Sequence, residues 1–339
     1  MYQLIQFLAA IAIGFLTLSW SADRLIEVAS TLAFRLGMSV LTIGMTIVAF
    51  GTSAPELLVS SVAAYNGAGG ISVGNALGSN TINIGLVLGA VGLMVPLVVS
   101  PRILYRELPV LGLVMALCVV LLLDGHLGRI DGFVLGGTLL AYCYYLTRSA
   151  RGEEGDAGDV VILKISTPRA WIEALLMLAL LMGSSQILVW GATGMARYMG
   201  VSELVIGLTV IAFGTSLPEL AAALASARKG LFDMTLATVI GSNIFNLLGV
   251  LAFPGIIGNG IALDPEILHR DVLAMVGLTL LLAVIAYTSI VRQPPKMATA
   301  ETGALSAPAE NGYCLIPRYK SLLLLIGFVL YLGWLFMTA

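Results

Sequence analysis

The chain has 339 residues, of which 59% are hydrophobic and 11% are charged, and its formal net charge is −2. A soluble domain carries roughly 25% charged residues, so this composition excludes an ordinary soluble protein and indicates several membrane-spanning segments. Nothing in the sequence points to a nucleic-acid partner. The three cysteines, Cys118, Cys143 and Cys314, lie far apart. We therefore expect buried thiols rather than a disulfide framework or a metal site.

Ten membrane spans are expected, because a helix needs about 20 apolar residues to cross the bilayer. The first covers residues 4–34; it lacks the basic start of a cleaved signal peptide, and its apolar run is too long for one. Within it, Asp23 and Arg24 are expected to form a structural pair. The other spans are expected near residues 39–64, 71–99, 103–123, 130–147, 171–198, 202–227, 234–257, 271–291 and 321–337.

Two polar segments interrupt the apolar pattern. Residues 149–169 contain the sequence RGEEGDAGD, and residues 292–319 contain QPPK. Both compositions predict flexible linkers, and the acidic residues of the first lack the spacing of an EF-hand calcium loop. The first linker is expected to divide the chain into two halves of five spans each, residues 1–148 and 170–339.

The basic residues predict the orientation of the chain. Thirteen Lys and Arg residues fall in odd-numbered connections between the expected spans, and three fall in even-numbered ones. Because basic residues collect on the cytoplasmic side, both termini and the even-numbered connections are expected on the outer, periplasmic side of a cell membrane. The thirteen are Arg35, Arg102, Arg106, Arg148, Arg151, Lys164, Arg169, Arg228, Lys229, Arg292, Lys296, Arg318 and Lys320; the three are Arg129, Arg197 and Arg270.

A 16-residue stretch occurs twice, as LTIGMTIVAFGTSAPE at residues 41–56 and LVIGLTVIAFGTSLPE at residues 204–219. The offset is 163 residues (204 minus 41), and the same offset relates the GSN triplet at 78–80 to that at 241–243. The repeated regions therefore extend over about two spans each, at 41–93 and 204–256. Five spans separate the copies, and five is odd, so the copies must cross the membrane in opposite directions. Such inverted repeats are typical of secondary transporters, which bind substrate where the two halves meet.

Each copy ends on a glutamate, Glu56 or Glu219, inside an apolar segment. A carboxylate at membrane depth indicates a functional site unless a buried cation compensates it, and neither helix supplies such a cation nearby. Pro55 lacks an N–H and interrupts the helix, which frees backbone carbonyl groups. Serine and threonine are also common where membrane helices pack closely, so a single one of them would more often be a packing residue. The expected ligand side chains are Thr52, Ser53, Glu56, Ser79 and Asn83 in the first half, and Thr215, Ser216, Glu219, Ser242 and Asn246 in the second. Carboxylate, amide and hydroxyl oxygens suit hard cations such as Ca2+ and Na+, whereas softer metals usually recruit Cys or His.

These motifs resemble the cation/Ca2+ exchanger superfamily, and above all the bacterial sodium/calcium antiporters of the inner membrane. The resemblance rests on GTSAPELLVS and GNALGSNTINIGLVLG in the first half, and on GTSLPELAAALASARKG and VIGSNIFNLLGVL in the second. It implies a ten-helix fold and adds the carbonyl groups of Ala49 and Ala212 to the expected ligands. It also implies that one Ca2+ and several Na+ ions compete for the cluster. Some members, including potassium-dependent ones, have aspartate where Asn246 stands, which argues against K+ co-transport here.

We therefore expect an all-α membrane protein with ten helices in two inverted repeats, which exchanges Na+ for Ca2+ by alternating access. Ca2+ and Na+ are the expected substrates; no cofactor, no enzymatic activity and no obligate protein partner is expected. Exchange of Ca2+ for protons, with Glu56 and Glu219 as proton carriers, is an alternative, and a cation channel is another. A membrane enzyme would need a nucleophile–base pair or a metal triad, and the only histidines, His126 and His269, lie away from the repeats.

Overall fold

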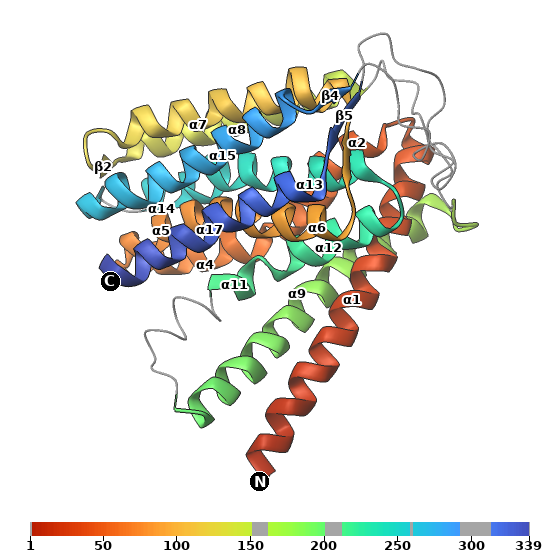
Figure 1. The fold of residues 1–339 in the computed structure, drawn as a ribbon, viewed down its shortest axis with the longest axis horizontal. Coiled ribbons are helices and arrows are strands. Elements are labelled where there is room, and N and C mark those ends of the chain that lie inside the picture. The colour runs from red at the N-terminus through yellow and green to blue at the C-terminus, as the bar shows by residue number, and fades with distance from the viewer. Residues whose placement is uncertain (1, 151–161, 201–211, 258–259, 292–312, 339) are drawn as a thin grey trace.

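The computed structural model describes residues 2–150, 162–200, 212–257, 260–291 and 313–338, which are mainly helical (Figure 1). The helices of the first half are α1 (Tyr2–Leu36), α2 (Val40–Ile43), α3 (Ala49–Thr52), α4 (Ala54–Tyr65), α5 (Gly69–Ile82), α6 (Gly89–Met94), α7 (Leu108–Leu122) and α8 (Arg129–Ala150). Those of the second half are α9 (Thr167–Tyr198), α11 (Ala212–Thr215), α12 (Leu217–Arg228), α13 (Phe232–Phe245), α14 (Ala252–Ile257), α15 (Leu273–Tyr287) and α17 (Arg318–Thr338). Short π-helical turns join several of them into longer rods: η1 (Gly44–Val48), η2 (Asn83–Leu88), η3 (Ile103–Glu107), η5 (Asn246–Val250) and η6 (Ile267–Val272).

Within the described residues, seven helical segments are long and apolar enough to cross a membrane. A bent pair, Val40–Thr52 and Ala54–Tyr65, adds an eighth if it is counted as one span. The axis of the helix bends by 42° between the two parts. The expected span at 130–147 corresponds to α8, whose Asp131 and tyrosines lower its mean hydropathy. The expected span at 202–227 begins outside the described residues. The seven segments are Gln3–Leu36, Gly69–Met94, Ile103–Leu122, Thr167–Tyr198, Phe232–Ile257, Ile267–Tyr287 and Arg318–Thr338.

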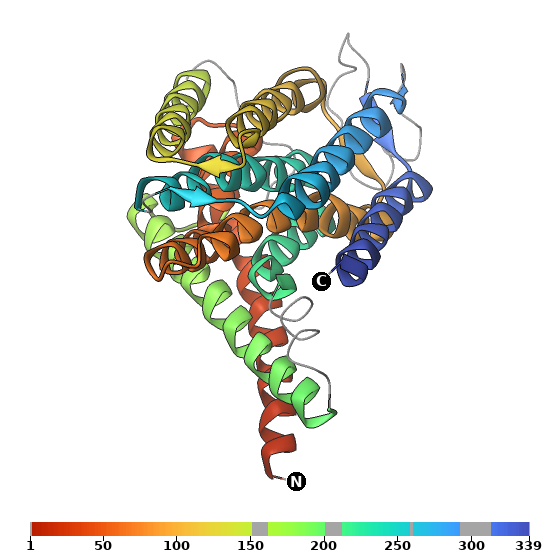
Figure 2. The same ribbon diagram turned by 90° about the vertical axis from the view of Figure 1, so that its left-hand side faces the viewer.

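Helices α1 and α9 lie side by side and project from the rest of the bundle, with the N-terminus at the far end of α1 (Figure 1, Figure 2). Small residues permit this close approach. A Cβ atom on Gly191 would lie 2.9 Å from the backbone oxygen of Phe7 and 3.0 Å from the Cβ of Ala10. On Gly14 it would lie 2.9 Å from the Cβ of Leu188. The pair is therefore held by packing of small residues, as is common between membrane helices.

Arg24 connects these two helices, and its partner differs from the one expected. Its guanidinium lies 2.6 Å from Glu173 of α9 and 3.1 Å from Glu27 of α1. The expected pair of Asp23 with Arg24 is wrong, because adjacent residues on a helix point in different directions. Glu27 also accepts a bond of 2.9 Å from Lys229, which follows α12. The charges near the middle of α1 thus hold α1 to α9 and to the end of α12.

The bounds of several helices recur at the 163-residue offset of the sequence repeat. Helices α3 and α11, α4 and α12, α5 and α13, and α6 and α14 begin and end at equivalent residues. Between α3 and α4, Ser53 has φ −81° and ψ 2°, and between α11 and α12, Ser216 has φ −91° and ψ 6°. Neither serine continues the helix, and a proline two residues later cannot donate the missing backbone bond. The helix interruptions predicted from the two GTSxPE motifs are confirmed.

Two small antiparallel sheets lie toward opposite ends of the bundle (Figure 1). At one end β2 (His126–Leu127) pairs directly with β3 (Ile261–Ala262). At the other, β5 (Tyr313–Ile316) lies between β1 (Leu97–Val99) and β4 (Ile290–Val291). Strands β1 and β3, and β2 and β4, are related by the repeat offset to within one residue. Within the described residues, the inserted strand β5 has no counterpart in the sheet of β2 and β3.

Strand β5 corrects the expectation that residues 292–319 form a flexible linker throughout. Its alternate residues Cys314 and Ile316 are each 1% exposed, so one face of the strand packs into the bundle. Residues 292–312 and most of the linker at 149–169 lie outside the described part. The three cysteines are free, as expected; Cys118 and Cys314 are buried, but Cys143 is only half-buried.

Candidate cation site

The two repeated glutamates lie in the first turns of two helices, Glu56 in α4 and Glu219 in α12. Both are 0% exposed. Each helix begins directly after its interruption, so each glutamate lies in a first turn, where backbone N–H groups lack partners within the helix. The positive end of a helix dipole stabilises a carboxylate at this position. The repeated sequence thus positions each buried carboxylate at a helix N-terminus.

Neither carboxylate has a full set of partners among the described residues. Both oxygens of Glu56 and Oε2 of Glu219 are buried without a hydrogen-bond donor. The hydroxyl groups of Ser79 and Ser216 lie near the carboxylate of Glu56, which also experiences the charge of Glu219. No basic side chain of the described chain forms an ion pair with either glutamate. A buried charge without compensation is strongly unfavourable, so this arrangement requires a cation or a proton.

Contacts between the halves converge on these glutamates. Ser53, which separates α3 from α4, donates a hydrogen bond of 3.3 Å to Oε1 of Glu219. Thr52 lies 3.3 Å from Ser242 of α13 through their hydroxyl oxygens, and Ser242 donates at 3.4 Å to the carbonyl of Ala49. Residues more than 160 positions apart in sequence therefore share one polar cluster.

Close packing of α13 against η1 and α3 makes these contacts possible. A Cβ on Gly241 would lie 2.8 Å from the Cβ of Ala49 and 3.0 Å from the Cα of Met45. A Cβ on Gly44 would lie 3.2 Å from Ala237. Glycine at these two positions brings the backbones together, which places the hydroxyl of Ser242 against the carbonyl of Ala49.

The turns η2 and η5, which contact α12 and α4 respectively, begin with two further asparagines at equivalent positions, Asn83 and Asn246. Both are 0% exposed. The side-chain nitrogen of Asn83 donates to Oδ1 of Asn243 at 3.1 Å, and its own Oδ1 has no partner. Both polar atoms of the Asn246 side chain are without a partner. Two neutral amide oxygens are thus available in the buried interior.

The structure buries every expected ligand side chain that it describes. The exposed fraction does not exceed 8%, the value for Thr215. The backbone of Ala212 begins α11, but its side chain is not described. The described residues in this buried set are Ala49, Thr52, Ser53, Glu56, Ser79, Asn83, Thr215, Ser216, Glu219, Ser242 and Asn246.

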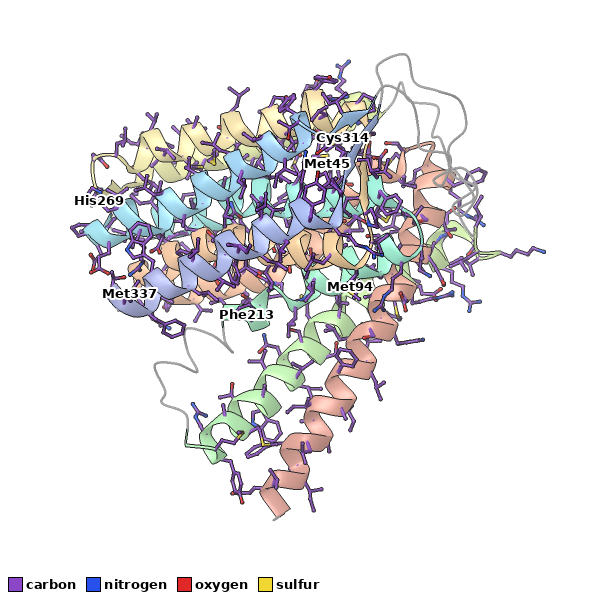
Figure 3. All side chains as sticks on the ribbon, viewed as in Figure 1. Met45, Met94, Phe213, His269, Cys314 and Met337 are labelled. Carbon is purple, nitrogen blue, oxygen red and sulfur yellow. The ribbon has the colours of Figure 1, made fainter. Side chains whose placement is uncertain are left out.

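The donor chemistry of this region is oxygen-rich. Within the described part of the chain, no group of three or more His, Cys, Asp or Glu residues could hold a metal ion. His126 and His269 are both exposed, and Figure 3 shows His269 at one end of the bundle, near Met337. The available ligands are two carboxylates with hydroxyl, amide and carbonyl oxygens. This set suits a hard cation held by a mixed shell of charged and neutral oxygens.

Sequence reasoning missed one residue that supports the site, Ser185 of α9. Pro218 has no N–H, which frees the carbonyl of Gly214 four residues earlier. The hydroxyl of Ser185 donates to that carbonyl at 2.7 Å. Ser185 is 2% exposed and lies outside both repeated segments, so only the three-dimensional structure connects it with the interruption between α11 and α12.

We predict that Ser185→Ala lowers the stability of the folded protein by about 1–3 kcal/mol, because it leaves a buried carbonyl without a donor. Ser184→Ala is the matched control: Ser184 is equally buried, but its hydroxyl donates within its own helix, to Leu181 at 3.0 Å. Thermal unfolding of the two variants in detergent should give a lower Tm for Ser185→Ala. Equal Tm values would contradict the role given to Ser185.

Comparisons with known proteins agree with this architecture. Candidate antiporter CaxA of Alkalimonas amylolytica is 43% identical over 281 residues, covering 80% of this chain and 87% of its own. The inner membrane protein YrbG of Escherichia coli K12 is 38% identical over 287 residues, covering 82% and 88%. A structure of the sodium-calcium exchanger NCX_Mj, soaked with Na+ and Sr2+, matches with a TM-score of 0.78 at 28% identity, over 97% of this chain and 98% of that one.

The family model of the sodium/calcium exchanger protein matches residues 6–148 and 170–337, which include both repeats and leave out the whole of the expected linker at 149–169. Together with the relatives, this match covers the buried cluster and the helices around it. The chain is a membrane protein that belongs to the sodium/calcium exchanger family, within the cation/Ca2+ exchanger superfamily.

Proposed function

We propose that this protein exchanges Na+ for Ca2+ across the membrane, with both ions bound in turn by the cluster around Glu56 and Glu219. The observation that carries the proposal is the duplicated, fully buried oxygen cluster whose two carboxylates have no basic partner in the described structure. Two carboxylates balance the charge of one Ca2+. The neutral oxygens around them extend the shell toward the six to eight ligands that Ca2+ takes.

The proposed ligands come from equivalent positions in both halves. Glu56 and Glu219 supply charge, and the asparagines supply neutral amide oxygen. Hydroxyl groups come from Thr52, Ser53, Ser79, Thr215, Ser216 and Ser242, and backbone carbonyl groups from Ala49 and Ala212. The cross-half contacts of Ser53 with Glu219 and of Thr52 with Ser242 support a single shared site.

Na+ is favoured over H+ as the exchanged ion, because the cluster offers more than titratable groups. A proton carrier needs a carboxylate and little else, whereas Na+ needs several oxygen ligands. The relative MaX1 of Methanosarcina acetivorans, 28% identical over 298 residues, is named a sodium/calcium exchanger. Exchange of Ca2+ for protons remains the alternative, and the tests below separate the two.

Alternating access follows from an arrangement of ten membrane helices in two inverted halves, residues 1–148 and 170–339, joined by the linker at 149–169. The recurrence of helix bounds at the repeat offset supports this arrangement. In this arrangement the cluster lies where the two halves meet. Bound Ca2+ and bound Na+ each stabilise a different balance of the outward-facing and inward-facing states. An ion can shift that balance only through its different affinity for the two states.

The protein is proposed to lie in the inner membrane with both termini in the periplasm and the linker in the cytoplasm. We predict that an alkaline phosphatase fusion at Ala339 is active and that a green fluorescent protein fusion there is dark, because basic residues collect on the cytoplasmic side. Fusions near Gly155 should give the reverse result. A fluorescent fusion at Ala339 in intact protein would show that the orientation is wrong.

We predict that Glu56→Gln or Glu219→Gln abolishes Ca2+ transport, reducing uptake at least a hundredfold, because each removes one charge from a dehydrated divalent ion. The control is Glu266→Gln, since Glu266 pairs with Arg270 at 3.0 Å and its side chain is 54% exposed. All three variants should insert and elute as folded protein. Uptake of radioactive Ca2+ into proteoliposomes measures the effect, and near-normal uptake by either cluster variant would remove that glutamate from the site.

We predict that Ca2+ uptake into vesicles requires an outward Na+ gradient. Replacement of internal Na+ by K+ or choline should stop uptake, and a pH gradient alone should not restore it. Uptake driven by a pH gradient in the complete absence of Na+ would instead establish proton exchange. Ca2+ uptake that needs neither a Na+ nor a H+ gradient, and that stops only when Ca2+ reaches its equilibrium potential, would indicate a channel.

A further inference from the structure

Two further asparagines, Asn80 and Asn243, are related by the repeat offset and lie beside the cluster. Each follows the serine of a GSN triplet, Asn80 on α5 and Asn243 on α13. They are 1% and 0% exposed. Two buried carboxamides at equivalent positions need hydrogen-bond partners, and those partners differ between the halves.

Asn243 contacts the opposite half through both its side chain and its backbone. Its Oδ1 accepts a hydrogen bond of 3.1 Å from the side-chain nitrogen of Asn83. Its backbone oxygen accepts one of 3.2 Å from the side-chain nitrogen of Asn80. The proposed ligand Asn83 is therefore held by its NH2 group, and its Oδ1 has no protein partner.

This geometry determines which end of the Asn83 carboxamide faces the cluster. A cation attracts the carbonyl oxygen and is repelled by the amide hydrogens. With the NH2 group bonded to Asn243, the oxygen is the atom left to meet an ion. Asn243 thus orients a ligand without having to be one.

The equivalent contact in the other half would join Asn246 to Asn80, since Asn246 corresponds to Asn83 and Asn80 to Asn243. It is not formed in this structure. Both polar atoms of the Asn246 side chain and Oδ1 of Asn80 are buried without partners, whereas the nitrogen of Asn80 is directed to the backbone of Asn243 and, at 3.8 Å, to the sulfur of Met275. One of two equivalent carboxamide contacts is made, and the groups needed for the other are present and unused.

We propose that Asn243 and Asn80 are positioning residues that alternate: Asn243 orients Asn83 in the state described here, and Asn80 orients Asn246 in the opposite state. This inference rests on the proposed exchange function. Each half then determines how well the ligand asparagine of the other half can bind an ion, because the residue that orients each ligand asparagine belongs to the opposite repeat. The two hydrogen-bond patterns are the two arrangements of a switch that each state stabilises.

The test is a double-mutant cycle in proteoliposomes, with Asn243→Leu, Asn83→Ala and the combination. Asn243→Leu should raise the Ca2+ concentration for half-maximal uptake about threefold to tenfold, the equivalent of one lost hydrogen bond, with little change in maximal rate. In the Asn83→Ala background it should cause no further rise, because the carboxamide that it positions is absent. Thr81→Val is the control, since Thr81 is buried on α5 and donates only within its own helix, to Leu77 at 2.9 Å.

The proposed alternation is tested by comparing Ca2+ uptake from the two faces of the membrane. With Ca2+ presented to opposite faces in right-side-out and inside-out vesicles, Asn243→Leu should weaken uptake mainly at one face and Asn80→Leu mainly at the other. Should the leucine variants fail to insert, Asn243→Ala and Asn80→Ala, which cannot overpack, give the same comparison.

Three results would overturn the inference while leaving the exchange function intact. The first is that the Ca2+ concentration for half-maximal uptake does not change in the Asn243 variants. The second is that Asn243→Leu raises it by the same factor whether or not Asn83 is present. The third is that the variants have equal effects at the two membrane faces. Absence of Na+-dependent uptake by the wild-type protein and Thr81→Val alike would instead overturn the proposed function, and the inference with it.

Discussion

Two carboxylates with no basic partner in the described structure, buried inside an apolar bundle, are the constraint on which this structure depends. Removing a charge from water is so unfavourable that Glu56 and Glu219 can remain ionised only beside a compensating cation. The surrounding protein reduces this penalty without removing it. Helix N-termini face the carboxylates, and a hydroxyl from Ser53 bonds to Glu219. The remaining unpartnered oxygens leave a deficit that a mobile ion can fill, which is a property that a permanently satisfied ion pair could not provide.

The helix interruptions are the second requirement, because they free backbone carbonyl groups inside the helical segments. A continuous helix uses its own carbonyl groups, whereas the prolines after Ser53 and Ser216 leave some of them free. Such groups must be satisfied within the protein at membrane depth. In the second half Ser185 of α9 bonds to the freed carbonyl of Gly214. The helix pair α1 and α9, which projects from the bundle, is thereby connected to the interruption before α12 by a buried hydrogen bond as well as by packing.

The sequence predicted the features that depend on local chemistry. The repeated GTSxPE motif predicted the interruptions, and the polar residues at helical spacing around it predicted which side chains are buried together. Features that depend on the meeting of distant segments were not predictable in this way. Arg24 pairs with Glu173 of α9 rather than with its neighbour Asp23, and nothing in the local sequence near either residue indicates that contact. Ser185 and strand β5 were missed for the same reason. Ser185 donates to a carbonyl group 29 residues away, and β5 pairs with β1, which lies far earlier in the chain. The linkage of Asn83 to Asn243 required the packing of α13 against the first half.

An exchanger needs two states of similar free energy, and an inverted repeat offers a physical route to them, since exchanging the conformations of the two halves gives a second structure with nearly the same contacts. The differences between the halves then determine which state is preferred in the absence of ions.

Three such differences are present here. Strand β5 separates β1 from β4 at one end, while β2 and β3 pair directly at the other. The residue of α1 that the offset of 163 (185 minus 22) relates to Ser185 is Ala22, which has no hydroxyl group to donate as Ser185 does. The carboxamide contact of Asn83 is formed, and that of Asn246 is not. The first two are fixed by the sequence, whereas in the alternation proposed above the third reverses as the halves exchange conformations. In that proposal, bound ions act on the reversible element, because the opposite half sets which of the two asparagines, Asn83 or Asn246, presents its carbonyl oxygen.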